Sequence, residues 1–236
     1  MAFTREDSNL INYQGQRLVR FFPSAGFILP VNSENAVASG VVSKEQEASC
    51  VKEMRFSFDE RGLTREQVMM LDIMANNEWK RGISFSSPGG SEVSIALYRR
   101  GYIKQNGMAF ELNPIDNGST RFNTDKMYTN LMTRYDYGAM SNPDVLTDYY
   151  ARRHTAQYRL HFLSLAEEFI SRAFSAEQSN ERRTMMASMG QDVSRMGAVV
   201  SAEEISDYKK KAKALIDKSI AVMPPSLVLD YGEPNV

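Results

Sequence analysis

The sequence predicts an α+β fold, in which a small mixed sheet with helices is followed by a C-terminal helical hairpin. Strand-like and helix-like segments alternate as far as residue 122, and from residue 123 onward apolar residues recur at helical spacing. The chain has 236 residues, 42% of them hydrophobic and 24% charged, so it can bury a core. We expect a flexible arm over 1–16, an α+β subdomain over 17–122 and a helical subdomain over 123–236.

The first part of the α+β subdomain has the pattern of short strands around one short helix. Residues 17–31 fit one or two strands, which their two prolines confine to edges or ends. Residues 32–40 fit a helix that either Asn32 or Ser33 caps. Residues 54–60 alternate between apolar and polar types, which is typical of a strand.

The segment LTREQVMMLDIMANN carries the clearest helix signal of this half. Thr64 and Gln67 have the spacing of a capping box, and the helix should end near Asn76–Asn77. A wide apolar face is predicted on it, made of Val68, Met69, Met70, Leu71, Ile73 and Met74.

After this helix the pattern changes several times within thirty residues. Residues 82–86 fit a short buried strand, residues 91–103 a helix, and residues 108–114 a strand that ends at a proline. Between the first two, the pair Gly89–Gly90 indicates a turn rather than a phosphate-binding loop.

The second half of the chain is predicted to be helical. Residues 123–137 place Met127, Leu131 and Tyr135 at four-residue steps. Residues 141–175 place another apolar set on one helical face, consisting of Tyr158, Phe162, Leu165, Phe169 and Ile170.

A Met-rich insert over residues 176–200 fits either a loose helix or a mobile excursion. The last helix begins at a second capping box, Ser201 and Glu204, and ends before Pro224–Pro225. Its predicted apolar stripe consists of Tyr208, Ala212, Leu215, Ile216 and Ile220.

The charge and the cysteine count exclude several classes of function. A net charge of −1 gives no bulk attraction for nucleic acid or for an anionic membrane. No apolar run approaches the roughly 18–20 residues that span a bilayer, and the N-terminus lacks the apolar core of a signal peptide. We therefore expect the isolated chain to be soluble, without an export signal of its own and without inserting into a membrane.

Metal and cofactor binding are not predicted. Cys50 is the only cysteine, so neither an internal disulfide nor a Cys-based zinc site can form. His154 and His161 lie seven residues apart, which differs from the four-residue spacing of two helical ligands of one metal.

Three stretches resemble parts of one known family. Residues 70–85, MLDIMANNEWKRGISF, are similar to the pattern LDI-(two residues)-NN-x-W-x-RPIYF of a group of large bacterial multi-pass membrane proteins named as a domain of unknown function. Residues 123–170 resemble its D-x-MY-x-NLM…PDV segment. Residues 211–225, KAKALIDKSIAVMPP, are similar to the tetratricopeptide-like helix that follows. Gly82 and Ser84 depart from the pattern, which usually has Pro and Tyr there.

The resemblance implies a role inside a larger protein. It implies a protein O-glycosyltransferase of the GT-C type, which takes its sugar from a lipid carrier and has its catalytic carboxylates in an N-terminal membrane half. The present chain resembles the C-terminal part of such a protein. We therefore expect a non-catalytic domain at the periplasmic face of the cytoplasmic membrane, where it supports the membrane half or presents the acceptor protein. The expected partners are that membrane half and an acceptor protein or glycan.

The only tryptophan, Trp79, lies where the predicted helix turns into a strand. It can plug the seam between helix and sheet, with Lys80 or Arg81 over its ring, while Asn76 and Asn77 satisfy the last helical carbonyls or take the left-handed cap. Alternatively, Asn76, Asn77, Trp79 and Arg81 face a cleft and hold a sugar or an acceptor peptide. The sequence alone does not decide between a structural role and a binding role for Trp79.

A second candidate binding patch is Arg152 and Arg153, which follow Tyr149–Tyr150. Basic and aromatic side chains together can bind a phosphate or an acidic peptide. Residues of this kind also form ordinary solvated faces, paired here with Asp144, Asp148 or Glu167.

No arrangement of residues predicts catalysis. The sequence has no Ser–His–Asp pattern with a nucleophile elbow, no carboxylate pair placed by a motif, and no histidine linked by a motif to Cys50. We expect no catalytic residue in this chain. Two alternatives to the glycosyltransferase domain remain: a stand-alone protein–protein interaction module, and a glycan-binding or hydrolytic domain with two carboxylates in a cleft near Trp79.

Overall fold

The computed structural model describes residues 10–19, 26–57, 64–116, 121–193 and 196–225. The chain divides into two compact units, Met1–Asn123 and Thr124–Val236. The subdomain boundary predicted after residue 122 lies one residue from this division. Within the described ranges, no helix combines the length and the apolar character needed to cross a membrane.

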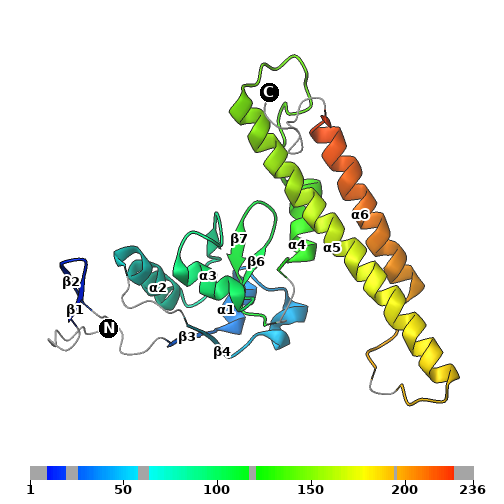
Figure 1. The fold of residues 1–236 in the computed structure, drawn as a ribbon, viewed down its shortest axis with the longest axis horizontal. Helices are drawn as coiled ribbons and strands as arrows, with labels where there is room; N and C mark the ends of the chain where they lie inside the picture. Colours follow the sequence, from blue (N-terminus) through cyan, green and yellow to red (C-terminus); the bar gives the residue numbers. More distant parts are fainter. Residues whose placement is uncertain (1–9, 20–25, 58–63, 117–120, 194–195, 226–236) are drawn as a thin grey trace. The chain divides into compact units, whose positions relative to one another are not determined.

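The first unit is built from short strands and short helices (Figure 1). In chain order these are β1 (Leu10–Tyr13), β2 (Gln16–Val19), β3 (Gly26–Pro30), α1 (Ser33–Ala38), the 3-10 helix η2 (Lys44–Ser49), β4 (Glu53–Ser57), α2 (Arg65–Asn77), β5 (Ser84–Phe85), α3 (Glu92–Arg99), β6 (Ile103–Gln105) and β7 (Phe110–Leu112).

Three small antiparallel sheets take the place of the single mixed sheet that the sequence predicted. β1 pairs with β2, β3 pairs with β4, and the third sheet has the order β5-β7-β6. A parallel bridge between Gln105 and Phe122 adds a further segment at the β6 edge. The α+β class of this unit is confirmed.

The helix starts of this unit follow the sequence signals. Asn32, rather than Ser33, caps α1, because its side chain accepts from the Asn35 amide at 2.9 Å. The predicted capping box of α2 is confirmed, with Thr64 and Gln67 bonded in both directions.

Several predicted elements differ from the structure. β1 lies inside the predicted arm of residues 1–16, of which residues 1–9 are outside the described ranges. The helix predicted over 91–103 ends at Arg99, because Gly101 adopts φ +80° and the Tyr102 amide returns to the Leu97 carbonyl at 2.9 Å. β5 has only two residues, one exposed and one half-buried, because it is an edge strand.

The core of the first unit brings β3 and β4 together with α2, α3 and β6. Among its buried side chains are those of Met54, Trp79, Val93, Leu97 and Ile103. The apolar face of α2 is narrower than predicted. Met74 is buried, but Met69 and Ile73 are more than half exposed, because α2 meets the core along one side only.

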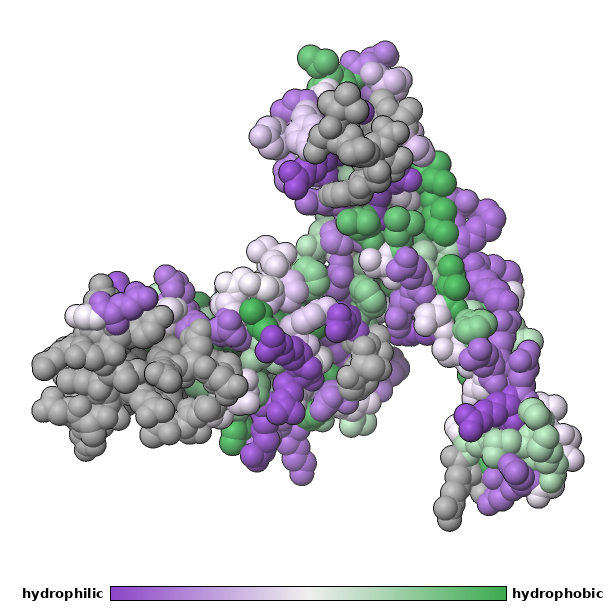
Figure 2. Space-filling view, viewed as in Figure 1, coloured by the Kyte–Doolittle hydropathy of each residue, from purple (hydrophilic) through white to green (hydrophobic). Residues whose placement is uncertain are grey.

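The second unit is helical. It contains α4 (Thr124–Thr129), the π-helix η3 (Asn130–Arg134), α5 (Tyr149–Ser188) and α6 (Ala202–Val222), and α5 and α6 form a long hairpin (Figure 1). The C-terminal helical hairpin of the predicted fold is therefore present. The face of this hairpin that is seen in Figure 2 carries both hydrophobic and hydrophilic residues.

One apolar seam holds the hairpin together. From α5 its buried members are Phe162, Leu165, Ala166, Phe169, Ala173 and Ala176, and from α6 they are Ile205, Ala212 and Leu215. The sequence pattern also placed Ile170 and Ile220 on the packed faces, but both are exposed. The Met-rich insert is helical as far as Ser188 and then becomes a connection, which Asn180 holds by accepting from the Val200 amide and donating to the Val200 carbonyl.

Candidate functional site

The predicted Trp79 corner is a tight left-handed turn at the end of α2. α2 ends at Asn77, and the next two residues, Glu78 and Trp79, have φ angles of 49° and 63°. The asparagines were predicted as candidates for the left-handed cap, and this is wrong, because Glu78 takes that conformation. A left-handed backbone costs a residue other than glycine about 1–2 kcal/mol, so the surrounding structure must stabilise this turn.

Two hydrogen bonds from distant segments hold the corner. The indole N–H of Trp79 donates to the Pro30 carbonyl of β3 at 2.9 Å. The side-chain amide of Asn35 in α1 donates to the Glu78 carbonyl at 2.9 Å. The Trp79 ring is 4% exposed and belongs to the core of the unit. These contacts favour the structural interpretation of Trp79, because the ring has no free face on which a sugar could stack.

The other candidate binding residues at the corner are engaged locally. Asn76 donates to the Asp72 carbonyl and to the Asp72 carboxylate, both at 2.9 Å, as expected for a side chain that satisfies a late helical carbonyl. Asn77 donates to the Arg81 carbonyl at 2.7 Å. The Arg81 side chain is exposed, while Lys80 pairs with Glu78 at 2.5 Å. A binding role for Asn76, Asn77, Trp79 and Arg81 stays a prediction.

A buried polar pair that the sequence did not reveal lies in the sheet β5-β7-β6. Lys104 and Glu111 are directly opposite each other on β6 and β7, and they are only 3% and 7% exposed. Burial lowers the pKa of Lys104 from 10.5 to about 8, while the nearby Asp116 carboxylate acts in the opposite direction. The strand predicted over 108–114 contained Glu111, but no strand was predicted at Lys104, so the pairing of the two residues was missed.

Gly82 leaves room for this pair. A Cβ atom at Gly82 would lie 3.2 Å from a Glu111 carboxylate oxygen and 3.5 Å from a Val41 methyl group. Gly82 stands where the resembling family usually has proline. Its lack of a side chain thus lets the Glu111 carboxylate approach the backbone closely.

Arg152 and Arg153 lie in the first turns of α5, in the second unit. Tyr149 and Tyr150 before them are 51% and 67% exposed and meet edge to face at 5.6 Å. Asp148, a predicted ion-pair partner of these arginines, instead caps the helix by accepting from the Ala151 amide at 2.7 Å. The patch is accessible, and its role in binding stays a prediction.

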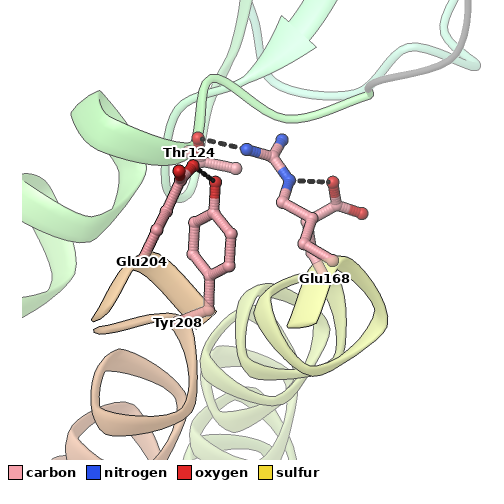
Figure 3. A network of polar contacts seen from close by, with 5 residues as sticks. Thr124, Glu168, Glu204 and Tyr208 are labelled. Atoms are coloured by element: carbon pink, nitrogen blue, oxygen red, sulfur yellow. Dashed lines mark hydrogen bonds and ion pairs between the residues drawn. The ribbon is translucent and has the colours of Figure 1, made fainter. Parts of the chain in front are cut away.

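The densest polar cluster of the second unit joins α4, α5 and α6 (Figure 3). Arg172 donates to Glu168 at 2.8 Å and to the Thr124 hydroxyl at 3.4 Å. Tyr208 donates to the Glu204 carboxylate at 2.6 Å. The hydrogen bond to Glu204, together with burial, raises the pKa of the Tyr208 hydroxyl.

Only one of the two hydrogen bonds of the second predicted capping box forms. Ser201 accepts from the Glu204 amide at 3.1 Å, as predicted, but the Glu204 side chain turns to Tyr208 one turn further along α6. Lys211 continues the cluster, since it pairs with Asp207 at 2.8 Å and lies 5.8 Å from the centre of the Phe169 ring. These contacts hold α4, α5 and α6 together.

Two further features bear on chemistry. Within the described part of the chain, no three or more His, Cys, Asp or Glu side chains gather where they could hold a metal ion. Burial raises the pKa of the Cys50 thiol, and Glu47 adds to this effect, so thiolate formation at neutral pH is suppressed.

A comparison with known families places the first part of the chain in one of them. The family described as TMEM260-associated domain 2 matches residues 1–133. The matched range includes the Trp79 corner, the Lys104–Glu111 pair and the whole first unit. No curated protein and no solved structure matches the chain.

Proposed function

Because the chain belongs to the TMEM260-associated domain 2 family, we propose that it serves as the non-catalytic, extracytoplasmic part of a membrane protein O-glycosyltransferase. Its role is to support the membrane half or to present the acceptor protein to it. The observation that carries this proposal is the family match over residues 1–133, because it coincides with the stretch whose LDI…NN-x-W pattern resembles the glycosyltransferase family.

The structure of that stretch is consistent with a supporting role. The Trp79 corner uses its indole and one amide to bind the backbone of its own unit. A motif that builds a rigid corner stabilises a scaffold, and a scaffold can position neighbouring loops of a larger protein. The motif therefore suits a domain that holds other parts in place.

The helical unit suits the presentation of a protein. We propose that α5 and α6 act as a tetratricopeptide-like hairpin, whose surface can bind an extended peptide or a neighbouring helix. The accessible Tyr149, Tyr150, Arg152 and Arg153 at the start of α5 offer aromatic and cationic groups for such a ligand. The place of action in this proposal is the periplasmic face of the cytoplasmic membrane.

The proposal is tested by reconstituting the chain with the multi-pass protein of the same genome that carries the membrane half. The two are co-expressed, solubilised in detergent and purified through a tag on the chain. Sugar transfer from a lipid-linked donor to an acceptor protein is then measured for the complex, for the membrane half alone and for the chain alone. We expect co-purification, faster transfer by the complex than by the membrane half alone, and no transfer by the chain alone.

Other outcomes would favour the alternatives. A chain that fails to bind the membrane half, yet binds a soluble protein, would be a stand-alone interaction module. A chain that binds or cleaves a glycan by itself would be a glycan-binding or hydrolytic domain. Either result would overturn the proposed role.

A further inference from the structure

The long helix α5 carries a second apolar stripe besides the seam that it shares with α6. The stripe consists of Leu160, Leu163, Ile170 and Phe174, which are 46%, 39%, 51% and 58% exposed. Their spacing repeats every seven residues, as in a helix that packs along another helix. At 3.6 residues per turn, the stripe lies about 130° around α5 from the buried seam. These four apolar residues, with the two glutamates on the same face of α5, Glu167 and Glu181, are called the α5 stripe below.

Two carboxylates lie in line with the exposed apolar residues. Glu167 occupies the position between Leu163 and Ile170, and Glu181 follows Phe174 by one repeat of seven. Both are exposed, and within the described ranges neither takes part in a hydrogen bond or an ion pair. No lysine or arginine lies three or four residues away from either on the helix, so nothing on this face of α5 neutralises them.

Four other carboxylates of the hairpin form ion pairs, unlike Glu167 and Glu181. Glu168 pairs with Arg172 and Glu177 pairs with Lys209. On α6, Asp207 pairs with Lys211 and Asp217 pairs with Lys213. The α5 stripe is thus an apolar helix face with two unneutralised negative charges, fourteen residues or about 21 Å apart.

A second copy of the same helix is a poor partner for this face. In a parallel pair in register, Glu167 would meet Glu167 and Glu181 would meet Glu181. In an antiparallel pair centred on Phe174, Glu167 would meet Glu181. Both arrangements place like charges opposite each other, which is destabilising at such positions.

We propose that the α5 stripe binds an amphipathic helix of another protein, whose apolar face carries lysine or arginine opposite Glu167 and Glu181. The exposed apolar residues supply the contact area, and the two carboxylates fix the register and select a basic partner. This surface is separate from the Trp79 corner, and it would bind its partner whether or not the parent protein transfers sugar.

The test uses the full chain and two synthetic helical peptides. Both peptides have leucine and isoleucine along one face, and they differ only at two positions fourteen residues apart, which are lysine in one and glutamate in the other. Binding is measured by the fluorescence anisotropy of the labelled peptides at low salt. We expect the lysine peptide to bind about tenfold more tightly than the glutamate peptide, because two contacts change from attraction to repulsion.

The variant Glu167→Lys/Glu181→Lys should reverse this preference by a similar factor. The matched control, Glu66→Lys/Glu203→Lys, changes the net charge equally but lies outside α5, and it should keep the preference of the unmodified chain. A third variant, Ile170→Ser/Phe174→Ser, should bind neither peptide while its circular dichroism stays unchanged, because both side chains are exposed.

Three results would overturn the proposal. They are equal binding of the two peptides, a preference that the charge reversal leaves unchanged, and no binding of either peptide. Self-association of the unmodified chain that the serine variant abolishes would assign the stripe to a second copy instead.

Discussion

The two units place their large aromatic side chains differently. In the first unit Trp79 is 4% exposed, and its polar atom is bonded to a neighbouring strand. In the second unit α5 presents Phe169 at 1% exposure and, five residues later, Phe174 at 58%. The first unit packs its central aromatic into one core, whereas the long helix has two apolar faces and buries only one. Whether an aromatic side chain stabilises the core or stays available for binding therefore depends on whether another element packs against it.

The largest expected effect comes from removing the Trp79 ring. The change Trp79→Ala should lower the free energy of unfolding of the first unit by about 3–5 kcal/mol, because it opens a cavity in the core. Trp79→Phe keeps most of the ring and loses the bond to the Pro30 carbonyl, so a smaller loss is expected. Urea unfolding followed by circular dichroism measures both. A loss below about 1 kcal/mol for Trp79→Ala would contradict a buried role for this ring.

The contrast within α5 can be tested on two phenylalanines. Phe169→Ala should destabilise the helical unit by about 3 kcal/mol or more, because the ring is buried and stacks on Tyr208. Phe174→Ala should change the stability by no more than about 0.5 kcal/mol, since its ring is mostly exposed. Thermal unfolding of the two variants side by side measures the difference. Equal losses would mean that another part of the chain covers the α5 stripe.

The buried Lys104 should make the first unit more stable in mild alkali. Its pKa in the folded state is lowered from 10.5 to about 8, so between these pH values the unfolded chain binds more protons than the folded one. Stability should therefore rise as the pH increases from 8 to 10, by on the order of 1–3 kcal/mol.

The control for this prediction is Lys104→Met, which keeps the length of the side chain and removes the charge. Its unfolding free energy should lack the alkaline rise that the unmodified chain shows. If both proteins show the same pH dependence, the rise has a source other than Lys104.

The capping box of α2 is complete, whereas at the start of α6 the Glu204 side chain bonds Tyr208 instead. Double-mutant cycles can measure this difference. Glu204→Gln and Tyr208→Phe should be coupled by about 1 kcal/mol, because the two side chains share a charge-assisted hydrogen bond. In the first unit, Thr64→Ala and Gln67→Ala should be coupled instead, since those residues bond each other's backbone. Urea unfolding of the single and double variants gives both coupling energies. Additive effects at Glu204 and Tyr208 would show that Glu204 acts on the helix start alone.

A further small effect, at the end of α2, has the opposite sign. Glu78→Gly should stabilise the first unit by about 0.5–1 kcal/mol, because glycine adopts the left-handed φ of 49° without the steric cost. The lost ion pair to Lys80 is exposed and contributes little. The matched change Glu66→Gly, in the right-handed first turn of α2, should destabilise the unit. Destabilisation by both would show that the turn is not strained.

Several helix starts and the division into an α+β part and a helical part were predictable because they depend on local signals. Thr64 and Ser201 cap helices in the structure, as their side chains and spacing indicated, and of the two candidates Asn32 and Ser33 it is Asn32 that caps α1. Such caps act within one helical turn, so neighbouring residues in the sequence determine them. The resemblance of the stretch around Trp79 to one family also rested on a contiguous pattern.

The candidate sites were harder to predict because they depend on distant segments. Trp79 could be read as a plug or as a ligand platform, and only the packing of β3 and α1 around it favours the plug. The Lys104–Glu111 pair requires the register of β6 on β7, and no strand was predicted at Lys104. The Glu204 side chain accepts a hydrogen bond from the hydroxyl of Tyr208, four residues away, and does not complete the predicted capping box.

The sequence by itself determined the starts of α2 and α6, through their capping residues, and it also determined that the second half is helical with apolar residues at helical spacing. It placed Phe162, Leu165 and Phe169 on one apolar face of α5, and these are buried, but it also assigned the exposed Ile170 to that face and did not distinguish the α5 stripe. The tertiary structure separated the two faces by placing α6 against Phe169 and Ala173. The physical reason is that the hydrophobic effect is non-directional. Which apolar face of a helix becomes buried therefore depends on which neighbouring element packs against it.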